Sequence, residues 1–185
     1  MISKDAVRSW LHYLSCPILI DEAYVDFADE SCLALVRENE RVMVSRTLSK
    51  SYALAGLRFG FLIAQPQIIR ELRKVKDSYN CDALSIAGAC AALSDQEWLR
   101  QTRTKILATR ERLTRELQAL GFEVLPSQAN FVWCSRSDRQ SREIYETLKA
   151  HKVLVRYMNY PEWGDGLRIT VGTCLLYTSP SPRDS

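Results

Sequence analysis

One lysine of this 185-residue sequence, Lys50, lies in a segment of hydroxyl-bearing and small apolar residues, SRTLSKSYALAGLR (residues 45–58). Thr47, Ser49 and Arg58 of this segment could hold a phosphate, because hydroxyls donate hydrogen bonds and a guanidinium can bind an oxyanion through two N–H groups. A lysine beside a phosphate site in a desolvated loop can present its amine for Schiff-base chemistry. The alternative is a solvated surface charge, which the apolar and hydroxyl neighbours of Lys50 disfavour.

A second group of polar residues follows a short apolar run. The segment ILIDEAYVDF (residues 18–27) places Asp21 and Tyr24 just beyond residues that favour a strand buried on both faces, as in a parallel sheet. Open α/β sheets bind ligands at the carboxyl ends of their strands. Asp21 could therefore pair with a cationic ring nitrogen, and Tyr24 could reach the same ligand. Alternatively, Asp21 only caps the turn that follows the strand.

Two arginines occur in apolar segments further along the chain: Arg156 in VLVR (residues 153–156) and Arg168 in GLRITVGT (residues 166–173). An arginine on a short apolar strand is costly to bury without an anionic partner. That partner could be an anionic ligand or a structural carboxylate of the protein, and for Arg156 the sequence favours neither.

The segments that must position these residues alternate between helical and strand patterns. Helical spacing of apolar residues predicts helices at residues 4–14, 31–38, 66–76, 82–93 and 95–120. Gly121 follows the last of these at a natural C-cap position. Continuous apolar runs predict strands at residues 16–20, 42–45 and 57–64. Strands that alternate with helices indicate an α/β architecture.

The pattern changes beyond Gly121. Short strands are predicted at residues 122–125, 130–134, 153–156 and 167–171, with a helix at residues 139–150. We therefore expect three parts, which are the end of a large α/β domain (residues 1–77), connecting helices (78–120) and a small α+β domain (121–173). Residues 174–185, CLLYTSPSPRDS, are rich in Ser and Pro, and we expect them to be a non-native tail, with a native disordered terminus as the alternative.

Composition excludes several classes of function. A net charge of +3 gives no broad electrostatic footprint for nucleic acid or a membrane surface, and no apolar run is long enough to span a bilayer. The six cysteines are scattered singly, and only two histidines accompany them. We therefore expect no metal site, and six reduced thiols favour a cytoplasmic protein.

The motifs together resemble fold-type I pyridoxal-phosphate (PLP) aminotransferases, and most closely the histidinol-phosphate aminotransferase family. The resemblance is carried by ILIDEAYVDF, RTLSKSYALAGLRFGF, ANFVW, VLVR and GLRITVGT, in the order found in that family. It implies a large parallel-sheet domain followed by a small C-terminal α+β domain. It also implies that the chain is a fragment, which is shorter than full-length members of the family and lacks their N-terminal half.

The same resemblance implies roles for individual residues. Lys50 would hold PLP covalently and then move a proton between the substrate α-carbon and the cofactor. Asp21 would keep the pyridine nitrogen protonated, and Tyr24 would hydrogen-bond the ring hydroxyl. The cofactor phosphate would be held by Thr47, Ser49 and Arg58.

Roles toward the substrates also follow from the resemblance. Arg168 matches the family's clamp on the substrate α-carboxylate, and Arg156 would contact the distal phosphate of histidinol phosphate. Asn130 matches a position near the site, although a role in a turn is an equal alternative. The implied reaction is amino-group transfer between histidinol phosphate and 2-oxoglutarate by a homodimer.

Other functions are compatible with parts of the pattern. A threonine-phosphate decarboxylase or an aromatic aminotransferase would use nearly the same residues. ILIDEA also matches the Walker B strand of a nucleotide hydrolase, but the chain contains no G-x-x-x-x-G-K-[ST] loop. A fragment without catalytic activity is the remaining alternative.

Overall fold

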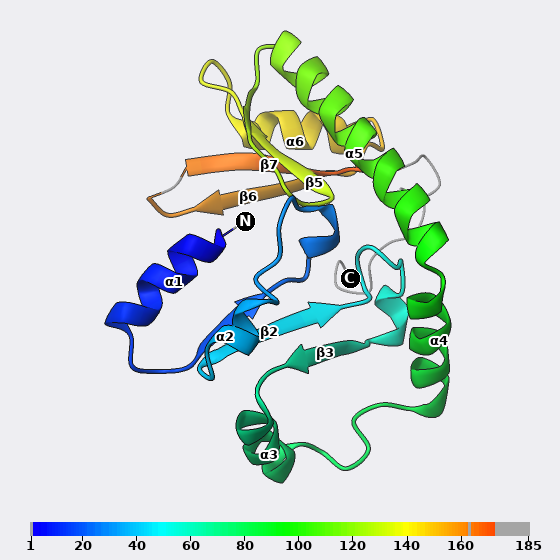
Figure 1. Cartoon of the computed structure of the whole chain (residues 1–185). Coiled ribbons are helices and arrows are strands. Elements are labelled where there is room, and N and C mark those ends of the chain that lie inside the picture. The colour runs from blue at the N-terminus through cyan, green and yellow to red at the C-terminus, as the bar shows by residue number, and fades with distance from the viewer. Residues whose placement is uncertain (1, 163, 173–185) are drawn as a thin grey trace. The chain divides into compact units, whose positions relative to one another are not determined.

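The computed structural model describes residues 2–162 and 164–172 (Figure 1). It forms two compact units, residues 1–102 (unit 1) and 103–185 (unit 2), and the division falls inside the long helix α5 (Gln96–Ala119). Domain boundaries near residues 77 and 120 therefore stay predictions. The stretch 174–185, expected to be a non-native tail, lies outside the described residues.

Unit 1 contains a three-stranded sheet in the order β1-β2-β3. Strand β1 (Ile18–Asp21) pairs in parallel with β2 (Val42–Thr47), and β3 (Gly60–Ile63) pairs with β2 in the antiparallel direction. The remaining elements of this unit are α1 (Lys4–Tyr13), η1 (Val25–Phe27), α2 (Leu35–Glu38), η2 (Ala55–Leu57), α3 (Pro66–Val75) and α4 (Ala83–Ser94).

The sheet of unit 1 is mixed, with one parallel and one antiparallel pair of strands. A parallel return needs a crossover connection, usually a helix that covers one face of the sheet. Residues 48–59, which connect β2 to β3, contain only the single turn η2. The chain therefore returns beside β2 in the opposite direction, and the carboxyl ends of β1 and β2 still share one edge.

The core of unit 1 lies on one face of this sheet. Val42 and Val44 point inward at alternate positions of β2, as a strand with one buried face requires. They pack with Ile20 of β1, Val7 of α1 and Leu35 of α2. The prediction that β1 is buried on both faces was wrong, because Leu19 is 56% exposed and Asp21 is exposed. The described residues cover only the face that carries Ile20.

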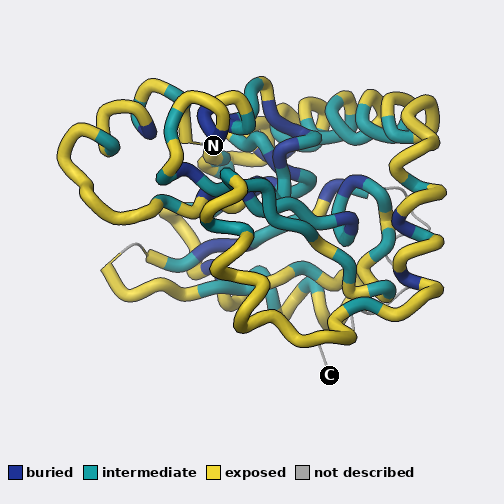
Figure 2. The backbone as a smooth tube through the Cα atoms, turned by 60° about the horizontal axis from the view of Figure 1, so that its bottom comes forward, coloured by how far each residue is buried: buried dark blue, intermediate teal, exposed yellow. Residues whose placement is uncertain are grey.

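Buried positions of unit 1 are concentrated between Ile20 and Ser51, whereas α3 carries no buried residue (Figure 2). Two helices begin at side-chain caps that accept backbone N–H groups. Ser3 caps α1 by accepting from Ala6 at 3.2 Å, and Asp82 caps α4 by accepting from Ser85 at 2.9 Å. The helix expected at residues 31–38 is shorter than predicted and begins only at Leu35.

Unit 2 is an antiparallel sheet with strand order β4-β5-β7-β6. The strands are β4 (Glu123–Leu125), β5 (Phe131–Ser135), β6 (Arg156–Tyr160) and β7 (Gly164–Thr170). Helix α6 (Ser141–Ala150) and the second half of α5 complete the unit. Its core combines Leu117 of α5 with buried residues on or next to the strands, namely Val132, Cys134, Leu167 and Val171.

One strand of unit 2 was placed wrongly from the sequence. A strand was expected to end at Arg156, but β6 begins there, and Val153 and Leu154 are exposed. The apolar VLV run suggested the strand, whereas the observed pairing follows the hairpin with β7, which extends from Arg156↔Arg168 to Tyr160↔Gly164. Arg156 is therefore the first residue of its strand.

The end of α5 confirms the prediction for Gly121. This glycine has φ +86°, a left-handed conformation that residues with a Cβ adopt at a cost. The N–H of Phe122 donates to the carbonyl of Leu117 at 3.0 Å, which closes a Schellman-type helix end.

Among the described residues, no helix has the length and apolar character needed to cross a membrane.

Candidate functional site

Asp21 is the last residue of β1, at the edge where β1 and β2 both end. Its Oδ1 accepts the N–H of Ala23 at 2.9 Å and lies 3.5 Å from the hydroxyl of Ser45, the residue opposite it on β2. Asp21 thus caps the turn after the strand, as its structural alternative predicted. The carboxylate is also exposed, so the same side chain remains accessible to a ligand at this edge.

Lys50 and Tyr24, which the sequence predicted to serve one ligand, lie together. The Lys50 Nζ is 5.5 Å from the centroid of the Tyr24 ring, within the range of a cation–π contact. Tyr24 immediately precedes η1, and Lys50 lies in the connection after β2. The contact therefore joins the segments that follow two adjacent strands.

Thr47 and Ser49 form a cluster of hydroxyls beside Lys50. The Thr47 hydroxyl lies 2.9 Å from the Ser49 hydroxyl and 3.2 Å from the carbonyl of Phe59, and it accepts the Ser49 N–H at 3.1 Å. The N–H of Leu48 also donates to Phe59, at 3.2 Å. These bonds place Phe59, the residue that follows Arg58 in the sequence, against the hydroxyl cluster.

Arg58 itself has φ +52°, a left-handed conformation that is uncommon for a residue with a side chain. Its Nη1 donates to the carbonyl of Ala55 at 2.9 Å, and the residue is exposed. A guanidinium has five N–H donors, so this one bond leaves donors for an anion. Backbone strain of this kind is concentrated at functional sites.

A cavity of about 300 Å³ in unit 1 shares Arg58 with this site. It is otherwise lined by residues 56, 57 and 59 and by residues 80–82, 84 and 85 at the start of α4. The Ser85 hydroxyl donates to the carbonyl of Leu57 at 2.9 Å and holds α4 against η2. Asp21, Tyr24 and Lys50 do not line this cavity, so it extends the site only on the side of Arg58.

The remaining predicted residues belong to unit 2. Arg156 of β6 and Arg168 of β7 are directly opposite in the antiparallel register, and the Arg168 guanidinium carbon lies 4.0 Å from the centroid of the Phe131 ring. The main-chain carbonyl of Asn130 accepts the Val171 N–H at 2.7 Å, which ties β5 to β7. This bond involves only the main chain, so both the site role and the turn role of the Asn130 side chain stay predictions.

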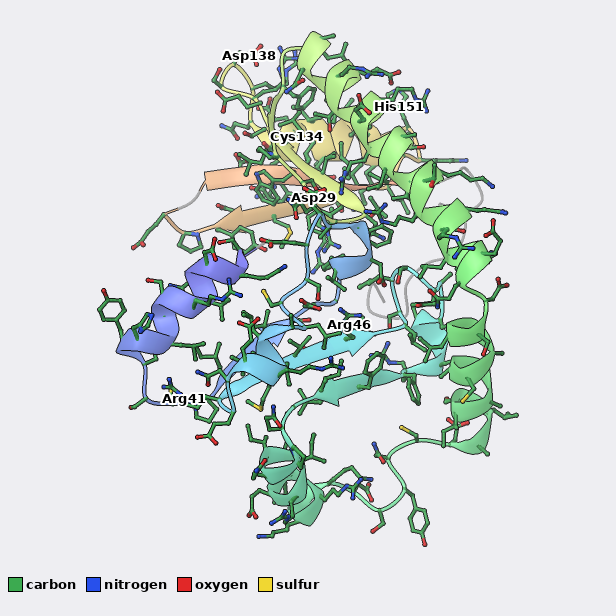
Figure 3. All side chains as sticks on the ribbon, viewed as in Figure 1. Asp29, Arg41, Arg46, Cys134, Asp138 and His151 are labelled. Atoms are coloured by element: carbon green, nitrogen blue, oxygen red, sulfur yellow. The ribbon has the colours of Figure 1, made fainter. Side chains whose placement is uncertain are left out.

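Sequence reasoning missed a charged pair next to the site. Glu22, only 2% exposed, is paired with Arg46 of β2, which is labelled in Figure 3, at 2.9 Å. Burial raises the pKa of the neighbouring Cys32 thiol, and the charge of Glu22 raises it further. The sequence contained a signal for this pair. Glu22 directly follows Asp21, and Arg46 directly precedes Thr47, so each charge is adjacent to a predicted site residue.

The free cysteines of the described residues differ in burial. Cys32 and Cys134 are buried, whereas Cys16 and Cys90 are exposed and Cys81 is intermediate. Cys174 lies outside the described residues.

Comparisons with known proteins identify the family of the chain. Residues 5–175 match the model of the family described as aminotransferase class I and II. A histidinol-phosphate aminotransferase of Rhodopirellula baltica is 56% identical over 173 residues, which are 94% of this chain and 48% of the relative. Histidinol-phosphate aminotransferase 1 of a Nostoc species is 46% identical over 173 residues, 94% of this chain and 49% of that relative.

A solved structure shows the same fold. The histidinol-phosphate aminotransferase of Sinorhizobium meliloti, in complex with pyridoxal-5'-phosphate, has a TM-score of 0.85 at 26% identity and is matched over 95% of this chain and 50% of its own. The chain thus spans about half the length of the relatives it matches. The fold-type I architecture expected from the motifs is confirmed. By its family match and its fold, the chain belongs to the aminotransferase class I and II family.

Proposed function

We propose that this chain carries the cofactor-holding part of a PLP-dependent aminotransferase whose amino donor is histidinol phosphate and whose acceptor is 2-oxoglutarate. The observation that carries the proposal is the contact of the Lys50 amine with the Tyr24 ring, beside the hydroxyls of Thr47 and Ser49. Relatives named histidinol-phosphate aminotransferase, 46% to 56% identical to this chain, support the choice of substrate.

The donors and acceptors at the end of β1 and β2 fit PLP. The cofactor has a phosphate, a ring hydroxyl, a ring nitrogen and an aldehyde, and each needs a different partner. Two hydroxyls and the guanidinium of Arg58 suit the phosphate, and the exposed carboxylate of Asp21 suits a protonated ring nitrogen. Tyr24 suits the ring hydroxyl, and the amine of Lys50 suits the aldehyde.

When bound, PLP supplies an electron sink for the charge that develops when the substrate α-carbon loses its proton. The protein residues orient the reaction and handle its protons. Asp21 would hold the proton on the ring nitrogen, because its carboxylate stabilises that positive charge. Lys50 would take the proton from the α-carbon and return it, acting as base and then as acid. Thr47, Ser49 and Arg58 would keep the cofactor in one orientation.

The arginine pair of unit 2 suits both proposed substrates. Histidinol phosphate carries a phosphate ester, and 2-oxoglutarate carries two carboxylates, so each brings at least one anionic group. Arg168 would bind the carboxylate, Arg156 the distal phosphate, and Asn130 would lie near the site. A homodimer and a cytoplasmic location, which the resemblance and the thiols suggest, belong to the same proposal.

The alternatives considered from the sequence are less well supported. Relatives that are 46% to 56% identical to this chain are named histidinol-phosphate aminotransferases, which disfavours a decarboxylase, an aromatic aminotransferase or a nucleotide hydrolase. The alternative of a fragment without catalytic activity applies only to this chain by itself. The two experiments below therefore test cofactor binding on this chain and turnover in a full-length protein.

Cofactor trapping tests the proposal on this chain. The protein is incubated with PLP and reduced with borohydride, and the modified lysines are then mapped by peptide mass. We expect the label to be concentrated on Lys50 and to be absent from that peptide in Lys50→Ala. Lys74→Ala, which removes an exposed lysine of α3, is the matched control and leaves Lys50 labelling unchanged. Label spread evenly over the surface lysines contradicts the proposed cofactor site.

A chimera tests the substrate. Residues 5–172 of this chain replace the matching segment of the Rhodopirellula baltica relative, which supplies the remainder of a full-length protein. We expect the chimera to convert histidinol phosphate in the presence of 2-oxoglutarate, and Lys50→Ala to abolish turnover. A well-folded chimera that turns over an aromatic amino acid but not histidinol phosphate contradicts the assigned substrate.

A further inference from the structure

The buried carboxylate of Glu22 binds groups from two other segments of unit 1. It accepts the Cys32 N–H at 2.5 Å and the Ser31 hydroxyl at 2.9 Å. It also accepts the Arg46 Nε at 3.1 Å and Nη2 at 2.9 Å. A buried charge is stable only when it is paired and fully hydrogen-bonded, so the position of this carboxylate is tightly determined. The segment after β1 is thereby fixed to the end of β2.

A second bond joins the same two segments further along. The Ser51 hydroxyl donates to a carboxylate oxygen of Asp26, and Ser51 is 2% exposed. Asp26 lies in η1, and Ser51 is the residue directly after Lys50. The loop that carries Lys50 is thus tied down on the far side of the lysine from Arg46.

The tethering residues alternate along the chain with the predicted site residues. On the β1 side, Asp21 and Tyr24 alternate with Glu22 and Asp26. On the β2 side, residues 47, 49 and 50 of the site lie between Arg46 and Ser51. The contact of Lys50 with Tyr24 therefore lies between the two bonds, Glu22–Arg46 and Asp26–Ser51.

We infer that Glu22–Arg46 and Asp26–Ser51 are two positioning tethers, which hold the Lys50 amine against Tyr24 and set where the amine meets a bound aldehyde. The part of this inference that concerns PLP rests on the proposed function. We call the four tether residues positioning residues, because their bonds to one another fix the two segments that carry the predicted site residues.

The physical case for positioning, beyond stability, comes from the cost of the buried pair. Replacing a buried ion pair with apolar residues of similar volume is often neutral or stabilising, so stability alone is weak grounds for Glu22–Arg46. The benefit is geometric. Residues 48–54 of the loop are otherwise held by few backbone bonds, among them Leu48 to Phe59 and Leu54 to Leu48. A displacement of about 1 Å at a reacting group can cost on the order of 100-fold in rate.

Hydrogen exchange on the full chain without cofactor tests the tethers directly. We expect Ser51→Ala, a nearly isosteric change, to speed exchange of the amides of residues 48–54 at least about tenfold, since local opening governs exchange. The amides of Val42 and Val44 should exchange as in the wild type. Arg8→Gln, which breaks the exposed α1–α2 ion pair with Glu38, is the control and leaves residues 48–54 unchanged.

The other tether needs a variant that does not strand a buried charge. Arg46→Gln alone leaves Glu22 unpaired and can unfold the unit, so the double variant Glu22→Gln with Arg46→Gln removes both charges together. We expect faster exchange in residues 48–54 with the fold retained. Unchanged exchange in both Ser51→Ala and the double variant overturns the inference. So does exchange that rises equally in residues 42–44, because the bonds would then serve stability alone.

Cofactor trapping on the same variants separates this inference from the proposed function. With a wild-type protein that labels at Lys50, Ser51→Ala should lower the share of label on Lys50 several-fold, and Arg8→Gln should not. Equal labelling in the wild type and Ser51→Ala overturns the link between the tethers and the cofactor. A wild type that shows no preference for Lys50, together with the expected exchange pattern, contradicts the proposed function and supports the tethers as a property of the loop.

Discussion

Arg156 and Arg168 are directly opposite each other on the neighbouring strands β6 and β7. Cβ atoms at such positions lie about 4.5–5.5 Å apart, so the two side chains leave the same face of the sheet. Like charges directly opposite are destabilising in a sheet. The register thus places two like charges opposite each other, and an anionic ligand that reached both arginines would offset their repulsion.

Removing one of the two charges should stabilise unit 2. We expect Arg156→Gln to raise the free energy of unfolding by about 0.2–1 kcal/mol at low ionic strength, because it relieves the cross-strand repulsion. Added salt should shrink the difference, since Arg156 is exposed and its charge is screened. Urea unfolding at low and high salt measures both effects.

Arg142→Gln provides the matched control for this charge. Arg142 is an exposed residue of α6 and lies outside the β6–β7 pair, so its loss should change stability little. Equal stability of the wild type and Arg156→Gln at low salt would show that the two arginines do not repel each other. In the chimera described above, Arg156→Gln should raise KM for histidinol phosphate, so the gain in stability comes at the expense of binding.

Two glycines that flank Arg58 should respond differently to alanine. A Cβ on Gly60 would lie 2.9 Å from the carbonyl oxygen of Arg46, a backbone atom that moves only if the strands separate. We expect Gly60→Ala to cost about 1–3 kcal/mol through strain between β2 and β3. Lys50 labelling should fall as well, because Thr47 is paired with Gly60 in the register.

Gly56→Ala is the control for that substitution. No atom lies within 4 Å of a Cβ built on Gly56, and the residue does not have positive φ. We expect Gly56→Ala to be neutral or to stabilise by up to about 1 kcal/mol, since it restricts the unfolded chain. Thermal unfolding of both variants tests the contrast, and equal destabilisation by the two would contradict the close approach at Gly60.

The sequence indicated that Lys50 and Tyr24 lie together, but it did not reveal how the strands are connected. Lys50 and Tyr24 could be paired from their motifs, because residues after adjacent parallel strands meet at one edge of the sheet. The antiparallel return of β3 could not be inferred from the apolar run at residues 57–64, since a strand pattern carries no direction. The pairing of Glu22 with Arg46 was missed for a related reason. The two residues are 24 positions apart in the sequence, and they come together only when β1 and β2 pair.

The buried thiols should be chemically silent. Burial raises the pKa of the Cys134 thiol from 9.0 to about 11. At pH 8 a thiol with that pKa is almost wholly protonated, and the thiolate is the reactive form. We expect Cys134 to resist alkylation by iodoacetamide in the native chain, whereas the exposed Cys16 and Cys90 react. Mass mapping with and without urea distinguishes protection by the fold from inertness of the peptide.

The same shift predicts a dependence of stability on pH. The folded pKa of Cys134 is above the unfolded value, so the native state favours the protonated thiol. The contribution of this preference to the free energy of unfolding is fully present below about pH 9. It is lost as the pH rises toward about 11. Cys134→Val lacks the group, so the wild type should lose stability relative to the variant over this interval. A constant difference from pH 8 to pH 11 would contradict the raised pKa.

The two helices of unit 2 end in similar ways, but only one end was visible in the sequence. Gly121 predicted the end of α5. Lys152 occupies the corresponding left-handed position after α6, with φ +61°. The Val153 N–H donates to the carbonyl of Leu148 at 2.9 Å, as Phe122 does to Leu117. The strand wrongly placed at residues 153–156 followed from this missed turn, because a lysine gives no signal for a left-handed residue.

Lys152→Gly should therefore stabilise the chain. A left-handed conformation costs a residue with a Cβ roughly 1–2 kcal/mol, and glycine avoids that cost while losing more entropy on folding. We expect a net gain of about 0.5–1 kcal/mol in the free energy of unfolding. Glu146→Gly, at an exposed helical position of α6, should instead cost about 1 kcal/mol. Urea unfolding of the two variants decides the matter, since destabilisation by both would mean that residue 152 does not adopt the left-handed conformation in solution.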